Sequence, residues 1–467
     1  MTDSSQLRQA ILSAALETSN DGREPSFGTL YIPLSHQKAL RLEASVVVGG
    51  RGVGKSFWTA ALRDPKLRTT IGAVLPELDI ELFIGHSEKQ DDPAYPTEDE
   101  FTQLLHLGYP TLDIWKAVIH RWIAVQNQTQ IPDQTWPDTL EWQKNSPHES
   151  AALMRQPRTW KGLILFDALD RTSRDWQKMD AIVRGLLQAI LWLKSFNGLY
   201  GKVFLREDQA ERTVFNFPDA SKLKATKADL NWARHDLHGL LWQRLINAPE
   251  NSGQLLRDQL SLSSYKQVDG LYVLNEKMKR DTEQQRDAFI SLAGPWMGRD
   301  SRRGVPYTWS VSHLADGRGQ TSPRSFLAAI KEATDKTQER YPSHPLALHY
   351  ESIKLGIQKA SGIRVSELEE DYPWISDVMA PLRGLTLPCE FSVFEPRWQD
   401  HFPQGPSSIS SERLPAQHSE KGWQGIVEDL KRLGVMEIKK DGRIDMPDLY
   451  RVGFGLGRRG GVKPQNK

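Results

Sequence analysis

The chain has 467 residues, of which 39% are apolar, and it includes 15 tryptophans that can fill buried cores. This length exceeds one hydrophobic core and predicts two or three domains. Lysine plus arginine number 60 and aspartate plus glutamate 59, so the net charge of +1 excludes a general attraction to nucleic acid or anionic membranes. The single cysteine, Cys389, excludes an internal disulfide and a cysteine-based zinc cage, and it indicates a reducing compartment, by default the cytoplasm.

The N-terminal segment, residues 1–29, carries Leu7, Ile11 and Ala15 at helical spacing and predicts an amphipathic helix. It has no basic region followed by an apolar core, so we do not expect a signal peptide. The most apolar later run, residues 182–193, is interrupted by polar side chains and is shorter than the ~20 apolar residues that cross a bilayer. We therefore expect no membrane partner.

A glycine-rich loop follows a buried strand expected at residues 45–48 and precedes a helix that begins near Phe57. Its pattern, Gly-x-x-x-x-Gly-Lys-Ser in a strand–loop–helix context, is typical of a P-loop that binds the phosphates of ATP or GTP. Glycines let the backbone wrap the anion, the lysine bridges phosphate oxygens, and the serine hydroxyl can bind Mg²⁺. The predicted cofactors are a nucleoside triphosphate, ATP or GTP, and Mg²⁺. The predicted binding residues are Gly49, Gly50, Arg51, Gly52, Val53, Gly54, Lys55, Ser56 and Phe57.

Further strands and helices alternate along the first half of the chain. Helices are expected at residues 111–125, 176–196 and 230–246, and strands at 162–166 and 202–205. Residues 128–158 are polar and contain several prolines, which indicates an insertion. The alternation predicts an α/β fold with an open, mostly parallel sheet, whose functional residues follow the strands.

Acidic residues after the second of these strands are candidates for the metal and for the attacking water. Asp167 directly follows residues 162–166, and we expect it to bind Mg²⁺ together with Ser56. The carboxylate that activates water usually stands beside the metal-binding one, but that position is Ala168. Asp170 is therefore the candidate base, with a helix cap or an ion pair with Arg171 as the alternative, and slow hydrolysis is an open possibility.

Two arginines are candidates for contact with the γ-phosphate. Arg206 follows the strand at residues 202–205, and Arg324 lies in a later, helical region. The planar guanidinium suits both roles because it can meet two phosphate oxygens at once, although surface or interdomain salt bridges are equally compatible with the sequence. Arg171 and Arg174 are alternatives that would act on a neighbouring subunit.

The second half of the chain is predominantly helical in pattern. The predicted domain limits are an N-terminal helix at 1–29, a P-loop core at 30–250, a helical lid at 251–400 with helices at 323–333 and 347–361, a linker at 401–422, and a winged-helix-like domain with a basic tail at 423–467. In the last domain, acidic residues alternate with the basic ones Lys431, Arg432, Lys439, Lys440, Arg443, Arg458, Arg459 and Lys463. Its contacts could be with DNA or with protein.

Residues 30–345 resemble the KAP and STAND groups of P-loop ATPases. The resemblance rests on the glycine loop, on Leu-Phe-Asp-Ala-Leu-Asp-Arg at 165–171, on a strand ending at Arg206, and on Pro323-Arg324. In STAND proteins of the NACHT type a tiny residue follows the metal-binding aspartate, as Ala168 does, whereas KAP proteins normally have a second aspartate there. KAP proteins also often contain transmembrane helices, which we do not expect in this chain.

The resemblance implies an ASCE-type sheet and an ATP-driven conformational switch, frequently part of prokaryotic antiviral or conflict systems, that controls oligomerisation or an effector protein. A homo-oligomer, an effector, or both are the expected partners. The alternative function is a DNA-dependent ATPase or regulator that binds DNA through the winged helix. A scaffold stabilised by nucleotide without useful turnover is a third reading, because Ala168 removes the usual base.

Overall fold

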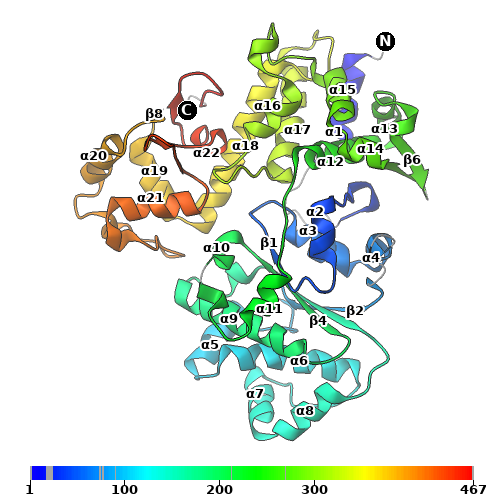
Figure 1. The fold of residues 1–467 in the computed structure, drawn as a ribbon, viewed down its shortest axis with the longest axis vertical. Coiled ribbons are helices and arrows are strands. Elements are labelled where there is room, and N and C mark those ends of the chain that lie inside the picture. Colours follow the sequence, from blue (N-terminus) through cyan, green and yellow to red (C-terminus); the bar gives the residue numbers. More distant parts are fainter. Residues whose placement is uncertain are drawn as a thin grey trace. The chain divides into compact units, whose positions relative to one another are not determined.

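The computed structural model describes residues 3–16, 25–72, 75, 78–89, 91–211, 213–268 and 270–464. Two compact units make up the chain: the sheet unit, Ile32–Asn231, and the helical unit, which joins Met1–Tyr31 to Trp232–Lys467 (Figure 1). The sheet unit is therefore inserted into the helical unit. Within the described ranges, no helix is long and apolar enough to cross a membrane.

The sheet unit alternates strands and helices. Its strands are β1 (Val46–Val48), β2 (Glu81–His86), β3 (Gly162–Phe166), β4 (Leu199–Leu205) and β5 (Ala228–Asp229). Its α-helices are α2 (Leu34–Leu40), α3 (Lys55–Arg63), α4 (Pro65–Gly72), α5 (Glu98–His106), α6 (Thr111–Gln126), α7 (Trp136–Asn145), α8 (Pro147–Arg155), α9 (Trp176–Leu193), α10 (Glu207–Ala210) and α11 (Ala220–Ala225).

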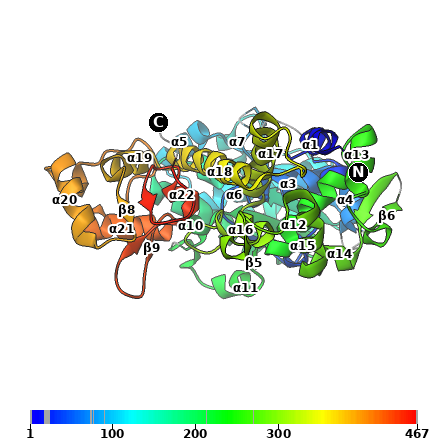
Figure 2. The ribbon, with the colours of Figure 1, turned by 90° about the horizontal axis from the view of Figure 1, so that it is seen from above.

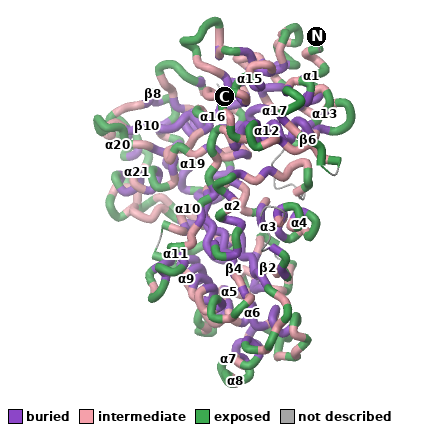
Figure 3. The backbone as a smooth tube through the Cα atoms, turned by 45° about the vertical axis from the view of Figure 1, so that its right-hand side comes forward, coloured by how far each residue is buried: buried purple, intermediate pink, exposed green. Residues whose placement is uncertain are grey.

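The five strands form one parallel sheet in the order β2-β3-β4-β1-β5. The register places Val46 of β1 opposite Val203 of β4, and Gly162 of β3 opposite Leu199 of β4. Consecutive residues of β1 and β3 are all buried, so both faces of the sheet are covered, as continuous apolar runs require. Figure 3 shows this burial along the strands, in contrast to the largely exposed α8. The predicted parallel α/β sheet is confirmed.

Helices α6 and α9 pack closely because α9 has a glycine at their contact. A Cβ on Gly185 would lie 2.3 Å from Thr111 Oγ1 and 2.7 Å from the backbone nitrogen of Leu112. Trp115 of α6 is fully buried and donates its indole N–H to the carbonyl of Ile182 in α9 at 2.9 Å. The segment at residues 128–158, expected as an insertion, contributes α7 and α8, which pack against α6 and each other (Figure 1).

A buried lysine joins β4 to the chain that enters β1. Lys202 has no exposed surface, and its Nζ donates to the carbonyls of Ala39 and Ala44 at 2.6 Å and of Arg41 at 2.8 Å. Three donors on one ammonium match three carbonyls at the end of α2 and in the following turn. Burial lowers the pKa of Lys202 to about 7, while nearby Glu43 acts in the opposite direction.

The helical unit contains the remaining elements. Its α-helices are α1 (Ser4–Ser13), α12 (Arg234–Ile246), α13 (Glu250–Arg257), α14 (Glu276–Arg280), α15 (Thr282–Ala293), α16 (Pro306–Ser312), α17 (Pro323–Arg340), α18 (Tyr350–Asp371), α19 (Trp374–Met379), α20 (Phe391–His401), α21 (Trp423–Arg432) and α22 (Asp448–Arg451). Its strands are β6 (Tyr265–Val268), β7 (Leu271–Leu274), β8 (Thr386–Leu387), β9 (Glu437–Ile438), β10 (Ile444–Asp445) and β11 (Gly457–Arg458).

Long helices α17 and α18 lie side by side in this unit (Figure 2), and α1 packs against α13 and α17. Arg8 of α1 is almost fully buried and donates to the carbonyls of Pro342 at 2.7 Å and Leu346 at 2.9 Å. The first helix of the chain is therefore fixed to residues more than 300 positions away.

The C-terminal part contains the helix and antiparallel hairpin expected for a winged helix, formed by α21, β9 and β10. Residues that precede the proline- and serine-rich stretch at 401–422 pack on and pair with this C-terminal part. Cys389 bridges to Ile444, β8 pairs with β11, and the rings of Trp398 and Trp423 stack 5.2 Å apart.

The chain passes from one unit to the other twice, between residues 31 and 32 and between residues 231 and 232. In each unit, a residue at the first passage contacts a residue at the second. In the helical unit, the ring of Tyr31 stacks on Trp232 with centroids 6.2 Å apart. In the sheet unit, Ser35 Oγ donates to the carbonyl of Asn231 at 2.9 Å. The chain therefore leaves and re-enters each unit through adjacent residues.

Candidate functional site

The glycine-rich loop connects β1 to α3 in the sheet unit, as predicted. Gly49 continues the strand by donating its N–H to the carbonyl of Leu205 at 3.1 Å. Gly52 and Gly54 have φ angles of 75° and 106°, which side chains disfavour, and a Cβ on Gly49 would lie 2.6 Å from Val53 Cγ2. The loop conformation therefore depends on glycine at these three positions.

Lys55 begins α3 and turns back over the loop. Its Nζ donates to the carbonyls of Gly49 and Gly50, each at 2.8 Å. Burial and the nearby Arg206 lower the pKa of Lys55 to about 8, against the effect of surrounding carboxylates. The side chain remains mainly charged at neutral pH, and an ammonium has a third hydrogen for another acceptor.

Asp167 and Ser56 lie together, although 111 positions separate them in the sequence. Asp167 directly follows β3, is 5% exposed, and lies close enough to the Ser56 hydroxyl and the Ala168 N–H for both groups to lower the pKa of its carboxyl. Burial raises the pKa of Asp167, while Lys55 and these two polar groups favour its charged form. A carboxylate thus meets a P-loop hydroxyl, as the sequence predicts for a metal-binding pair.

Asp170 lies in a short 3₁₀ helix, Leu169–Arg171, and forms an ion pair with Arg206 at 3.6 Å. Arg206 also pairs with Asp208 at 3.3 Å, so one guanidinium contacts two carboxylates at the ends of β3 and β4. All three side chains are largely buried. The structure therefore brings the predicted residues Asp170 and Arg206 together and adds Asp208, which the sequence analysis did not single out.

The other candidate arginines lie elsewhere. Arg171 pairs with Glu88 at 3.7 Å and Arg174 with Glu98 at 3.3 Å, and both arginines are at least half exposed. Arg324 is the second residue of α17 in the helical unit, where it pairs with Glu367 of α18. Its contact with a nucleotide stays a prediction.

Sequence reasoning missed His86, the last residue of β2. Its Nδ1 lies 2.7 Å from the carbonyl of Asp167, and its own carbonyl accepts the Asp167 N–H at 3.0 Å. The strand β2 was itself not predicted, because only part of Glu81–His86 is buried and its apolar pattern is weak. Because this strand was not predicted, the sequence offers no signal that His86 lies beside Asp167.

The described residues contain no group of three or more His, Cys, Asp or Glu side chains placed to hold a metal ion. Mg²⁺ does not need such a group, because it is commonly held by one or two carboxylates together with substrate phosphates. The pairing of the Ser56 hydroxyl with the Asp167 carboxylate provides two oxygen ligands at one place. These residues fit Mg²⁺ bound with a nucleotide.

The fold and the motif together define a P-loop protein with an ASCE-type sheet. In that class an additional strand lies between the P-loop strand and the strand that carries the acidic residue, as β4 lies between β1 and β3. The coarser part of the resemblance drawn from the sequence, to P-loop ATPase folds, agrees with this sheet.

No family model matches this sequence, and no curated protein matches it. Among solved structures, it is similar to Aeropyrum pernix ORC2 with ADPNP and ADP, at 12% identity and a TM-score of 0.42, over 92% of this chain and 93% of that one. It is also similar to A. pernix ORC1 in complex with DNA, at 12% identity and a TM-score of 0.36, over 94% and 93% of the two chains. The Walker-type ATPase PABY2304 of Pyrococcus abyssi matches at 13% identity and a TM-score of 0.33, over 93% and 96%. These scores do not assign the chain to a family.

Proposed function

We propose that this protein is a Mg²⁺-dependent ATPase whose nucleotide state acts as a conformational switch. The observation that carries the proposal is that Ser56 and Lys55, at the start of α3, lie beside Asp167, which follows the end of β3. A loop of backbone N–H groups, a cation and a carboxylate–hydroxyl pair are together the chemical groups that bind a nucleotide triphosphate with its metal.

The proposed roles follow from the contacts of each side chain. The N–H groups of Gly49 to Phe57 and the Lys55 ammonium hold the phosphates, and Ser56 and Asp167 hold Mg²⁺. When bound, the ion neutralises charge on the phosphate oxygens. Asp170 accepts a proton from the attacking water, and Arg206 fixes Asp170 through their ion pair while it faces the γ-phosphate.

The arrangement supports slow hydrolysis, which suits a switch. Ala168 has no carboxylate, and Asp170, the nearest candidate base, is already engaged with Arg206. The nucleotide-bound state would therefore persist long enough to control a partner.

The finer parts of the proposal rest on the resemblance to KAP and STAND proteins. They are an effector protein or a second copy as partner, a role in a prokaryotic antiviral or conflict system, a cytoplasmic location, and a contact of Arg324 with the nucleotide. The domain limits drawn from the sequence belong to the same proposal.

Phosphate release from ATP by the purified protein tests the ATPase, with and without Mg²⁺. Lys55→Ala should abolish nucleotide binding, whereas Asp167→Asn should retain binding but lose the Mg²⁺ dependence. The double exchange Arg171→Gln and Arg174→Gln, at exposed ion pairs, is the control and should leave the turnover of a monomer unchanged. Binding of ATP that is insensitive to Lys55→Ala would refute the proposed site.

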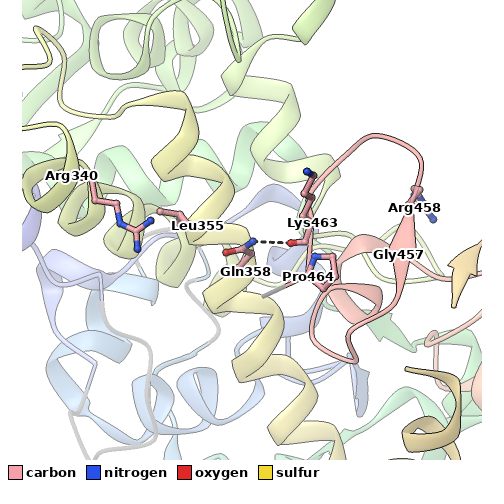
Figure 4. A pocket seen from close by; sticks show the side chains of 7 residues that line it. All are labelled: Arg340, Leu355, Gln358, Gly457, Arg458, Lys463 and Pro464. Atoms are coloured by element: carbon pink, nitrogen blue, oxygen red, sulfur yellow. Dashed lines mark hydrogen bonds between the residues drawn. The ribbon is translucent and has the colours of Figure 1, made fainter. Parts of the chain in front are cut away.

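DNA binding is a second candidate function, favoured by a basic pocket in the helical unit. The pocket, of about 600 Å³, is lined by Arg340, Leu355, Gln358, Gly457, Arg458, Lys463 and Pro464 (Figure 4). Gln358 Nε2 donates to the carbonyl of Lys463 at 2.7 Å and so fixes the tail beside α18. Three cationic side chains around a hollow favour phosphate groups.

Ion pairs reduce the charge of the predicted basic cluster. Arg432 pairs with Glu428 at 3.0 Å, Lys439 with Asp445 at 3.0 Å, Arg443 with Asp441 at 2.7 Å, and Arg458 with Asp448 at 3.3 Å. In the part of the chain that the structure describes, Lys431, Lys440, Arg459 and Lys463 have no ion-pair partner. We therefore rank DNA binding below the protein-directed switch.

Fluorescence anisotropy of labelled double-stranded DNA at several salt concentrations separates the two functions. Each phosphate contact contributes about 0.9 to the slope of log K against log salt. If DNA binds at this pocket, the double exchange Arg340→Gln and Lys463→Gln should therefore lower the slope by up to about 2. An unchanged slope would place the contact elsewhere, and no binding at low salt would remove this function.

A further inference from the structure

His86 and Asp167 form a reciprocal pair of hydrogen bonds between the ends of adjacent strands. The Asp167 N–H donates to the His86 carbonyl at 3.0 Å, and His86 Nδ1 lies 2.7 Å from the Asp167 carbonyl. A carbonyl oxygen only accepts, so Nδ1 must carry the hydrogen and donate it. The imidazole is thus a donor aimed at the backbone of the proposed metal ligand.

Aromatic rings enclose this imidazole and leave it little freedom. The centroids of Tyr95, Trp115 and Phe101 lie 5.0, 6.0 and 6.4 Å from that of His86. His86 is 3% exposed, and burial lowers its pKa to about 4. The donor is therefore held at one position by packing, and the ring is neutral at physiological pH.

The peptide that His86 contacts is under conformational constraint. It joins Asp167 to Ala168, and Ala168 has a φ of 55°, in the left-handed region that a residue with a Cβ rarely adopts. The Asp167 carbonyl and the Ala168 N–H belong to this one planar unit. The carbonyl accepts from His86, and the N–H lies near the Asp167 carboxylate and favours its charged form.

These contacts link the imidazole to the carboxylate through one rigid plane. His86 holds both the N–H and the carbonyl of Asp167, so it fixes the backbone from which the Asp167 carboxylate extends beside the Ser56 hydroxyl, and with it the direction of the Ala168 N–H. Without the imidazole donor, rotation of the peptide would relieve Ala168 and turn its N–H away from the carboxylate.

We propose that His86 is a positioning residue that holds Asp167 in the orientation required to bind Mg²⁺ with the nucleotide. The inference rests on the proposed nucleotide site and adds to it a residue on β2, whose side chain acts only through the backbone of Asp167. Groups that orient a metal ligand typically change metal affinity by 10- to 100-fold when they are removed.

Two variants of the full chain separate positioning from packing. His86→Leu fills much of the same space without a donor. His86→Asn keeps an N–H donor on the second atom beyond Cβ, where Nδ1 stands, but lacks the rest of the ring. The measurement is the affinity for a fluorescent ADP analogue, titrated in EDTA and then at increasing Mg²⁺.

His86→Leu should keep the EDTA affinity of the unchanged protein and need at least about 10-fold more Mg²⁺ for the same enhancement of binding. His86→Asn should recover most of the difference. Unchanged Mg²⁺ dependence in His86→Leu would overturn the inference. Loss of binding in EDTA by both variants would also overturn it, because His86 would then serve packing alone.

Asp167→Asn distinguishes this inference from the function on which it rests. If the unchanged protein binds the analogue more tightly with Mg²⁺ and Asp167→Asn does not, the metal site is established whatever His86 does. If Asp167→Asn retains the full enhancement, the proposed metal site fails, and the role of His86 fails with it.

Discussion

Replacing Asp170 by asparagine should reduce ATP turnover without weakening nucleotide binding. The exchange keeps the size of the side chain and removes the carboxylate that we propose as the base. Loss of a general base typically lowers kcat by about 10²- to 10⁴-fold. The KM for ATP should change little, because the groups proposed to bind the phosphates lie in the loop and not at Asp170.

Asp208→Asn is the matched control, because Asp208 contacts the same guanidinium. The two carboxylates lie 3.6 and 3.3 Å from Arg206, with 21% and 14% of their side chains exposed. At an effective dielectric constant of about 20, each attraction is about 5 kcal/mol before dehydration is counted. Measured net values for partly exposed pairs are about 1 kcal/mol, so each exchange should destabilise the protein to a similar, small extent.

Steady-state phosphate release and urea unfolding of both variants test this reasoning. Asp170→Asn should lose at least about 100-fold in kcat, whereas Asp208→Asn should stay within about threefold of the unchanged protein. Equal losses in the two variants would refute the role of Asp170 as a base, because Asp170 would then act only through the shared arginine. Tight ATP binding with no turnover in the unchanged protein would refute it as well.

Three further predictions concern packing and buried polar groups, each followed by urea unfolding. Gly185→Ala should destabilise the protein by about 1–3 kcal/mol, because its Cβ would meet the backbone of α6. The control Gly362→Ala, in open space on α18, should stabilise the protein by about 0.5–1 kcal/mol. Equal effects of the two exchanges would contradict the packing of α6 on α9. His36 accepts the Trp58 indole N–H on Nδ1 at 3.0 Å, and its pKa is lowered to about 3, chiefly by burial. His36 therefore binds a proton near pH 6.5 in the unfolded chain but only near pH 3 in the folded chain. The free energy of unfolding should fall as the pH drops through this window, and this group contributes at most about 1.4 kcal/mol per pH unit. His36→Asn should flatten that dependence, and an unchanged pH profile would contradict it. Lys202→Met should cost about 3 kcal/mol by leaving three buried carbonyls without a donor, and a cost as small as that of the exposed Lys194→Met would count against the contacts described.

The elements that the sequence predicted well have patterns dominated by burial. Strands β1 and β3 are continuous apolar runs, and the P-loop between β1 and α3 is specified by glycines whose backbone angles few other residues adopt. The tail hairpin followed from its tight turn at residues 440–442. For these segments, the local sequence contains most of the information that determines the structure.

The elements that escaped prediction depend on distant partners. The edge strand β2 is only partly buried, β5 has two residues, and β8 and β11 are defined by pairing with each other across 70 positions. In the candidate site, the meeting of Ser56 with Asp167 follows from strand order, which alternating strands and helices suggest. The contacts of Arg206 with Asp208 and of His86 with Asp167 depend on side-chain positions that no spacing reveals.

The contacts Tyr31–Trp232 and Ser35–Asn231 place the two passages of the chain between the units close together within each unit, which makes the chain suitable for rearrangement by engineering. Because the two ends of residues 32–231 lie beside each other, this segment can be expressed as a separate domain or circularised through a short linker. The same geometry lets the flanking segments, 1–31 and 232–467, be joined directly. A protease that cuts only one crossing would leave the two parts connected through the other.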